Sequence, residues 1–328
     1  MREDAGAEVC YGGAVTIGRA VLAIALAGAA GPGCGAPVLH RGYVASVPYS
    51  DAPLPARTKI FLVAGGVDVA NFAAEVAAQR SLWLARGFAA DEIACYWAAP
   101  TRPGFRGDRA QFRRLADALR PCYPASPALL REHLARAARE APPFLYVYVT
   151  THGLTSLVPG DVPKDLLPEP DRALLDQYTL QLGAGPGQGV DVAALIAGLR
   201  GGAAPDDLVL APGGLARALA AFPAATPKFV VLQGCHAGGF VEALATVPRL
   251  VGLMAARRDR TSFGCDPGQE MTYFGAIYHR LLGERLGAGG LAAIDWEGLF
   301  ARLEAEVAAA ERAAGTQPSL PVFVRGPG

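Results

Sequence analysis

The chain has 328 residues, of which 52% are hydrophobic and 18% are charged. This supply of apolar side chains is sufficient for a large packed core and excludes a chain that is disordered throughout. Lysine plus arginine balance aspartate plus glutamate at 30 each. Since no basic run with interleaved aromatic residues occurs, we expect no binding to nucleic acid.

The first 37 residues have the pattern of a leader segment. Arg19 precedes an apolar run at 20–30, which has signal-peptide length and is too short to span a bilayer. Cys34 follows among small residues and is a candidate for the lipidated first residue of a bacterial lipoprotein. We therefore expect export to the periplasm or as a membrane-anchored lipoprotein, with membrane contact only through this segment. The alternative is a disordered leader. Residues 38–57, rich in Pro, Ser and Ala, are expected to form a linker.

From residue 58 onward, strand and helix patterns alternate. Short apolar runs typical of buried strands occur at 60–64, 93–97, 144–153, 229–232, 250–255 and 320–324. Helical spacing occurs at 71–86, 129–141, 190–199, 212–222, 240–245, 274–282 and 296–312, and 99–126 is expected to be mostly loop. This alternation predicts one α/β domain over 58–328, with a mostly parallel central sheet and helices on both faces.

Residues 154–208 interrupt this pattern. They contain many Pro, Gly and Asp residues and show periodicity only in the short helix predicted at 190–199. A segment of this length without its own regular pattern is unusual in a compact domain unless it is functional. We expect an insertion or lid beside the active site.

Two predicted strands end in side chains that can do chemistry. The strand at 229–232 leads through a glycine turn to Cys235, and the strand at 144–153 ends in His152. Open α/β sheets place their reactive groups at the carboxyl ends of strands, and a cysteine nucleophile needs a histidine nearby. We therefore predict a nucleophile and acid/base pair. We also expect the helix after Cys235 to lower its pKa from about 8.5. The alternative is a buried structural cysteine.

The remaining cysteines indicate whether the protein could form a disulfide or bind a metal ion. If the protein is exported, a disulfide between Cys95 and Cys122 is plausible, because it would close the loop between a strand and the next helix. No CxxC motif and no Cys/His spacing typical of a metal site occurs in the sequence. We predict no metal and no organic cofactor.

Three blocks of sequence, in this order, resemble the caspase–legumain superfamily of cysteine peptidases, and most closely its legumain-like branch. They are residues 59–97, then 146–153 with the terminal His-Gly, then 230–239 continued by 255–275. The resemblance implies a caspase-like three-layer α/β sandwich. It also implies a cysteine endopeptidase, a hydrolase whose substrates are proteins or peptides.

The resemblance also implies catalytic roles. Cys235 would attack the peptide carbonyl to form an acyl-enzyme, and His152 would act as acid/base. Asn71 matches an asparagine that orients the histidine in the legumain branch. The backbone N–H groups of Gly153 and Cys235 would form the oxyanion hole.

The resemblance also extends to the pocket for the residue before the scissile bond, where the sequence departs from legumain. Ser262 matches a serine that lines this pocket, and Gly234 borders the substrate beside the nucleophile. Legumain's asparagine-selective pocket has an Arg-His pair where this chain has Ala73 and Ala74, and an aspartate where it has Ala276. We therefore do not expect strict cleavage after asparagine. Glu270 and Asp266 are candidates for a carboxylate that would select Arg or Lys.

Two other classes of function were weighed. The first is a catalytically inactive caspase-like binding module, which the missing pocket charges favour and the intact Cys, His and Asn disfavour. The second is an α/β-hydrolase or transferase that uses the cysteine. It is disfavoured because no GxSxG-type elbow is present and the later His279 lies in an apolar helix.

Overall fold

The computed structural model describes residues 49–67, 69–98, 108–158, 163–182, 191–264, 269–287 and 290–328. All of them belong to one compact unit that runs from Pro37 to Gly328. The predicted leader and the first part of the predicted linker, to residue 48, lie outside the described residues. Within the described part of the chain, none of the helices combines the length and the apolar character that a membrane span requires.

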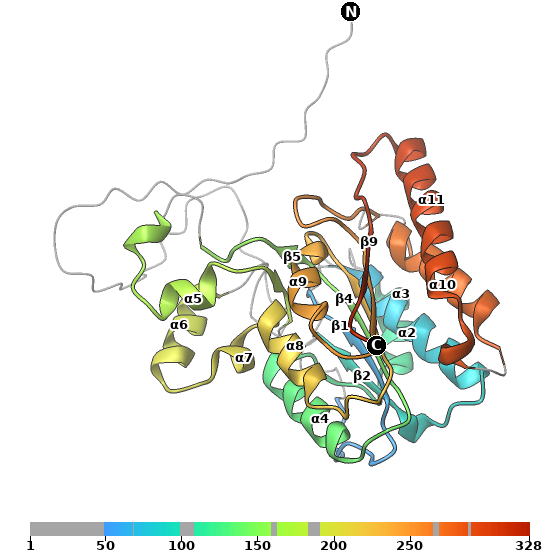
Figure 1. Ribbon diagram of the computed structural model, residues 1–328, viewed down its shortest axis with the longest axis horizontal. Coiled ribbons are helices and arrows are strands. Elements are labelled where there is room, and N and C mark those ends of the chain that lie inside the picture. Colours follow the sequence, from blue (N-terminus) through green and yellow to red (C-terminus); the bar gives the residue numbers. More distant parts are fainter. Residues whose placement is uncertain are drawn as a thin grey trace, which may run out of the picture. The chain divides into compact units, whose positions relative to one another are not determined.

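A seven-stranded sheet forms the centre of the unit (Figure 1). Its strand order is β3-β2-β1-β4-β7-β8-β9, and every pairing is parallel except that of β9 with β8. The strands are β1 (Ile60–Ala64), β2 (Ile93–Trp97), β3 (Tyr123–Pro124), β4 (Leu145–Thr150), β7 (Lys228–Gln233), β8 (Leu250–Met254) and β9 (Val322–Arg325). Strands β1, β2, β4, β7 and β8 are buried on both faces, as their continuous apolar sequences predict.

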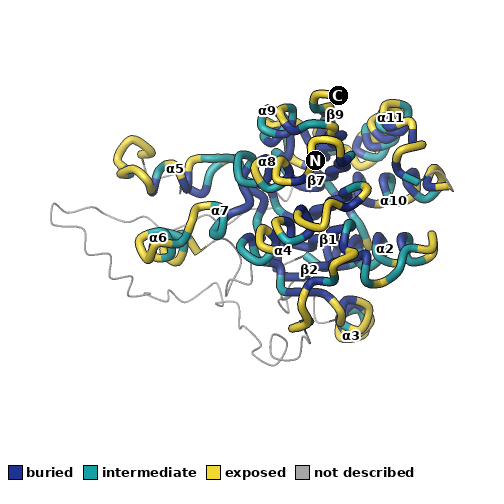
Figure 2. Tube along the Cα trace, turned by 60° about the horizontal axis from the view of Figure 1, so that its bottom comes forward, coloured by how far each residue is buried: buried dark blue, intermediate teal, exposed yellow. Residues whose placement is uncertain are grey.

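Helices cover both faces of the sheet. On one face lie α2 (Ala70–Ala85), α3 (Arg109–Ala118), α10 (Tyr273–Arg285) and α11 (Trp296–Ala314), and on the other lie α4 (Pro127–Arg139), α8 (Pro212–Ala220) and α9 (Val241–Leu244). Alternate residues of β1 point into the two layers: Leu62 belongs to the first apolar cluster and Val63 to the second. The buried strands lie between exposed helix surfaces in Figure 2. The predicted three-layer α/β sandwich is therefore confirmed.

The prediction that residues 99–126 are mostly loop is wrong for the described part of that range. Helix α3 and strand β3 lie within it. The carboxylate of Asp108 accepts hydrogen bonds from the backbone N–H groups of Ala110 and Gln111, which caps the start of α3. Phe112 and Leu115, three residues apart, then bury one side of the helix. The many Pro, Gly and Arg residues of this range masked the short amphipathic pattern.

The predicted insertion after β4 has secondary structure of its own. It contains β5 (Gly153–Leu154), α5 (Asp171–Leu175), β6 (Thr179–Leu180), α6 (Val192–Arg200) and α7 (Pro205–Leu208), with a 3-10 turn, η2, at Lys164–Leu166. Further 3-10 turns lie at η1 (Ala90–Glu92), η3 (Ala237–Phe240) and η4 (Leu291–Ala293). Leu157, Leu174 and Leu175 of the insertion pack with Val209 and Ala211 in a separate cluster, whereas Leu180 and Leu182 join the layer on the α4 and α8 side of the sheet. Helix α6 matches the helix predicted at 190–199.

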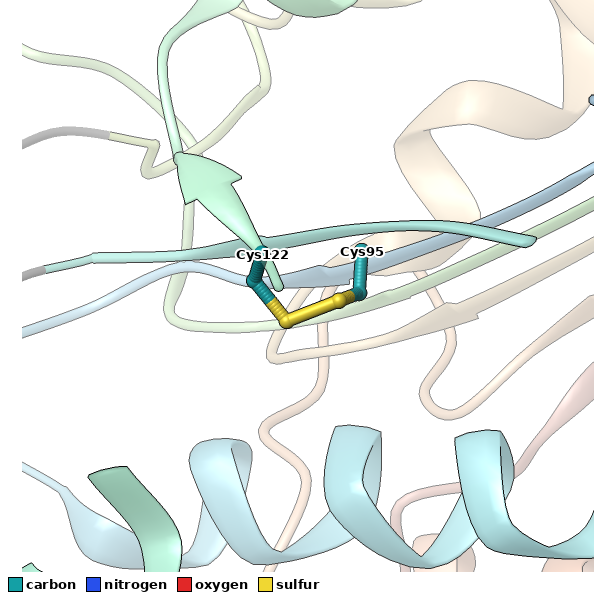
Figure 3. The surroundings of a disulfide bond; sticks show 2 residues. All are labelled: Cys95 and Cys122. Carbon is teal, nitrogen blue, oxygen red and sulfur yellow. A yellow bond between two sulfur atoms is a disulfide. The ribbon is translucent and has the colours of Figure 1, made fainter. Parts of the chain in front are cut away.

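A disulfide joins Cys95 of β2 to Cys122, which directly precedes the edge strand β3 (Figure 3). The predicted pairing is confirmed. The backbone N–H of Ser50 donates to the carbonyl of Cys122 at 2.9 Å, and Leu54 is buried. The described end of the predicted linker, 49–57, is therefore packed on the domain at this edge of the sheet.

Candidate active site

The pairing of β4 with β7 brings His152 and Cys235 to the same edge of the sheet. In this parallel pair Thr150 is in register with Gln233, and the backbone N–H of Thr151 donates to the carbonyl of Gln233 at 3.0 Å. His152 and Cys235 each lie two residues beyond the paired ends. Because neighbouring strands are about 4.8 Å apart, the two turns leave the sheet side by side.

Glycines allow these two turns to touch. A Cβ atom at Gly153 would lie 1.7 Å from the carbonyl oxygen of Cys235, and one at Gly234 would lie 2.7 Å from the carbonyl oxygen of Thr151. Any side chain at these positions would push the turns apart. The two glycines predicted at the site thus have a packing reason to be there.

The thiol of Cys235 is half-buried and is covered by the backbone of Ser262. The N–H of Ser262 donates to Sγ at 3.3 Å, and Sγ lies 3.7 Å from the carbonyl oxygen of the same residue. Burial raises the pKa of Cys235, and the hydrogen bond from Ser262 opposes this only in part. The expectation of a pKa lowered by a helix N-terminus is therefore wrong. The chain after Cys235 forms a 3-10 turn and the four-residue α9 in place of a long helix.

The two histidines near Cys235 differ in their surroundings. The ring of His152 packs edge-on against Phe72, with ring centroids 5.1 Å apart, and its carbonyl accepts a hydrogen bond from the N–H of Gln181 at 2.9 Å. The ring Nδ1 of His236 lies 3.0 Å from the carbonyl oxygen of Arg258. His236 has a φ of 58°, so it makes the left-handed turn that redirects the chain.

Asn71 is buried at the start of α2 and contacts the loop between β8 and α10. Its Nδ2 donates to the carbonyl oxygens of Gly264 at 3.2 Å and Gln269 at 2.8 Å. A side-chain amide has two N–H donors, and these bonds use both. The predicted contact that orients His152 would therefore have to be made by Oδ1.

The residues predicted for the pocket fall in different surroundings. Ser262 is buried, and its Oγ lies 3.5 Å from Nε2 of Gln233. Glu270 has a side chain that is 73% exposed and pairs with Arg114 of α3 at 3.4 Å. The expectation that Glu270 selects Arg or Lys stays a prediction, and in this structure its charge lies on the surface in an ion pair. Asp266 lies outside the described residues.

Sequence reasoning missed Glu75. This residue is 1% exposed, and its carboxylate accepts hydrogen bonds from the hydroxyl of Tyr148 at 2.7 Å and from the N–H and hydroxyl of Thr272 at 2.8 and 2.7 Å. Burial raises the pKa of Glu75, and these hydrogen bonds oppose the rise. The available signal was its position four residues after Asn71, which puts both side chains on one side of α2.

Gln233 is a second residue that the sequence did not single out. Its Oε1 accepts a hydrogen bond from the hydroxyl of Thr150 at 2.8 Å, and its Nε2 faces Ser262. Gln233 thus links the end of β4 to the loop that covers the thiol. Within the described ranges, three or more His, Cys, Asp or Glu side chains do not gather as a metal site requires.

Residues 203–323 match the Peptidase C13 family. The matched segment contains β7 with Cys235, and β8 with the loop that carries Ser262, while His152 and Asn71 precede it. This match agrees with the likeness of the sequence blocks. Over residues 203–323 the chain is therefore similar to the Peptidase C13 family.

Among solved structures, the chain is similar to protein GSU0716 from Geobacter sulfurreducens, known from a crystal structure. The two are 14% identical over 83% of this chain and 94% of that one, with a TM-score of 0.45. A likeness this distant bears on neither fold nor function. The search of curated proteins gave no match.

Proposed function

We propose that the protein is a cysteine endopeptidase that hydrolyses peptide bonds in proteins or peptides, without metal or organic cofactor. The observation that carries the proposal is the register of β4 with β7, which brings His152 and Cys235 to one edge of the sheet. The match to a peptidase family over the segment that contains Cys235 supports it.

In the proposed reaction, His152 takes the proton from the Cys235 thiol as the sulfur attacks the carbonyl carbon of the substrate. The tetrahedral intermediate collapses, the C–N bond breaks, and His152 gives its proton to the leaving amine. Water then attacks the thioester while His152 takes a proton from it. The C–S bond breaks, the acid is released, and the proton returns to sulfur.

The raised pKa of Cys235 bears on the first step. Burial favours the neutral form of the Cys235 thiol. Proton transfer to His152 is then part of the attack. In this proposal the backbone N–H groups of Gly153 and Cys235 donate hydrogen bonds to the oxyanion of the tetrahedral intermediate. Gly234 and Ser262 lie beside the substrate.

We also propose that the protein works outside the cytoplasm. The leader pattern before residue 37 and the Cys95–Cys122 disulfide both support this location. The same proposal includes attachment to the membrane through a lipid on Cys34. The mass of the N-terminal peptide, measured on protein purified from membranes, would reveal the lipid.

The test compares the full chain with Cys235→Ala and His152→Ala on a mixed peptide library, with cleavage mapped by mass spectrometry. His236→Asn is the matched control, because it removes the neighbouring imidazole and keeps a residue that tolerates the left-handed backbone. We expect both site variants to lose at least about a thousandfold in rate and the control to stay near wild type.

Full activity of Cys235→Ala would refute the proposal. Loss in His236→Asn with activity retained in His152→Ala would assign the base to the other histidine. If the wild-type chain cuts no peptide while Cys235 is open to iodoacetamide, the inactive binding module becomes the better description.

A further inference from the structure

Helix α2 holds the loop between β8 and α10 at two places, through Asn71 and Glu75. We propose that these two residues are positioning residues that fix this loop over Cys235, and that Glu75 thereby contributes to substrate binding without touching the substrate. The inference rests on the proposed peptidase function. It assigns to Glu75 a role that the likeness to known peptidases does not supply.

The first anchor is in the middle of the loop. Asn71 Nδ2 donates to the carbonyl oxygens of Gly264 and Gln269, on either side of the loop's centre. The backbone N–H of Tyr273 donates to the carbonyl of Phe263 at 3.2 Å, which ties the middle of the loop to the start of α10. The described residues of this half of the loop are therefore held by one backbone hydrogen bond and one buried amide.

The second anchor is at the end of the loop, where α10 begins. Thr272 donates both its N–H and its hydroxyl to the Glu75 carboxylate, and the same hydroxyl caps α10 by accepting from the N–H of Gly275 at 3.0 Å. A Cβ atom at Gly275 would lie 2.3 Å from the carboxyl of Glu75. The start of α10 is thus seated directly on Glu75.

The start of the loop reaches the thiol. Ser262 lies two residues before Gly264, and its backbone covers Cys235 Sγ from both its N–H and its carbonyl. Ser262 is also held from the side of the nucleophile, because the N–H of His236 donates to the carbonyl of Arg260 at 2.8 Å and Nε2 of Gln233 lies 3.5 Å from Ser262 Oγ. The anchors on α2 act together with these bonds to hold the loop over the thiol.

A purely structural contact between α2 and α10 would not need a carboxylate. Burying a carboxyl group is costly unless hydrogen bonds compensate, and an apolar side chain would fill the same space at lower cost. Here the hydrogen bonds go to Tyr148 of the central sheet and to Thr272 of the loop. Glu75 thus connects the strand that leads to His152 with the loop that covers Cys235.

The test uses the full chain and the variants Glu75→Ala and Glu75→Gln. The matched control is Gln79→Leu, because Gln79 lies one turn further along α2, is equally buried, and contacts Tyr146 rather than the loop. The first measurement is the rate of iodoacetamide alkylation at Cys235 as a function of pH, read from the mass of the Cys235 peptide. The second is the separation of KM from kcat on the best library peptide.

We expect Glu75→Ala to uncover the thiol. Alkylation should become at least about threefold faster, with its pH midpoint moving down toward the value of about 8.5 for a free cysteine, because burial is what holds the pKa of Cys235 up. At the same time KM should rise about tenfold with a smaller change in kcat. Glu75→Gln, which keeps an acceptor for Thr272, should recover most of both effects, and Gln79→Leu should change neither.

The other titratable and charged groups around Cys235 do not affect the comparison of alkylation pH profiles between variants. His152 after β4, His236 beside the nucleophile, and Arg258 and Arg260 after β8 are present in every variant and act on all pH profiles alike. The alkylation measurement needs no peptidase activity. If the wild-type chain cuts no peptide, the proposed function fails while the alkylation profiles still decide the role of Glu75.

Wild-type alkylation and KM in a folded Glu75→Ala variant would overturn the inference, and so would equal effects of Gln79→Leu. If Glu75→Ala does not fold, Thr272→Val tests the same contact from the loop side. It removes the hydroxyl that donates to Glu75 and keeps the backbone N–H. We then expect the same changes at smaller size, and their absence would overturn the inference.

Discussion

The backbone of Gly153 lies against the backbone of Cys235, so closely that a Cβ atom on Gly153 would lie 1.7 Å from the Cys235 carbonyl oxygen. The turn after the histidine strand and the turn after the cysteine strand therefore form one packed unit. Their relative position is set by contact between main chains, which is stiffer than contact between side chains. This stiffness suits a site in which a proton must pass between two particular side chains.

Gly153→Ala should separate the two turns. We expect a loss of about 1 to 3 kcal/mol in the free energy of unfolding, because the added methyl group meets backbone and cannot be accommodated by a rotamer change. Peptidase activity should fall with it. Gly283→Ala is the control, since Gly283 lies in α10 and its Cβ would come no closer than 3.6 Å to Leu82. That variant should be more stable by about 0.5 to 1 kcal/mol. Urea unfolding measures both.

The thiol of Cys235 should ionise at higher pH than a free cysteine. Because burial raises its pKa, the iodoacetamide reaction of the wild-type chain should reach half its maximal rate above pH of about 8.5. Chain unfolded in urea serves as the reference, and there the midpoint should return to the free value. A folded midpoint below that of the unfolded chain would indicate a preformed thiolate and contradict the mechanism in which His152 removes the proton during attack.

Glu75 should make stability depend on pH. Its pKa is raised in the folded state, so the folded chain holds the proton more tightly than the unfolded chain. The stability that this provides is complete below the unfolded pKa of about 4.3 and is lost as pH rises through the folded pKa. The free energy of unfolding of the wild type, minus that of Glu75→Gln, should therefore fall by up to about 1.4 kcal/mol per pH unit over that interval.

Urea unfolding of both proteins between pH 4 and pH 8 gives this difference. A difference that increases with pH would mean that the hydrogen bonds from Tyr148 and Thr272 outweigh burial and lower the pKa of Glu75. That result would contradict the direction assigned here.

Removal of the disulfide should lower the free energy of unfolding but leave the rate of peptide cleavage per folded molecule unchanged. The double variant Cys95→Ala, Cys122→Ala loses a cross-link between residues 27 apart, for which we expect about 2 to 5 kcal/mol. Strand β2 is separated from β4 by β1 in the sheet, so the rate per folded molecule should stay near wild type. Unfolding with and without reductant tests the first point, because reductant should destabilise the wild type alone. A large loss of rate in the folded variant would contradict the second.

Much of the fold could be predicted because the buried strands carry an unambiguous pattern. Runs such as Ile60–Ala64 and Leu250–Met254 are continuously apolar, and only a sheet covered on both faces accommodates a series of them. The order of strands and helices then placed Cys235 and His152 at strand ends. That part of the site follows from local sequence and chain order.

The rest of the site depends on contacts between distant residues. Glu75 is a charged residue inside a helix, and its burial results from contact with Tyr148 of β4 and with Thr272 and Gly275 at the start of α10. The pKa of Cys235 was predicted in the wrong direction, because burial of the thiol in the folded chain raises it and the hydrogen bond from Ser262, 27 residues later, opposes this only in part. Glu270 looked suitable for a pocket and instead pairs with Arg114, 156 residues earlier in the chain. Such long-range pairs leave no periodic trace in a single sequence.

The insertion after β4 packs partly in an apolar cluster of its own and also contacts the candidate active site. Leu157, Leu174 and Leu175 of the insertion form a cluster with Val209 and Ala211 that is separate from the two layers beside the sheet, whereas Leu180 and Leu182 pack into the layer that contains α4 and α8. The insertion reaches the site through Gln181 against His152 and the ring of Tyr178 against Gly239. On the proposed function, substitutions at Tyr178 and Gln181 would change the surroundings that a substrate meets beside His152 and Cys235. For an engineer, this is the segment to randomise when a new cleavage preference is sought.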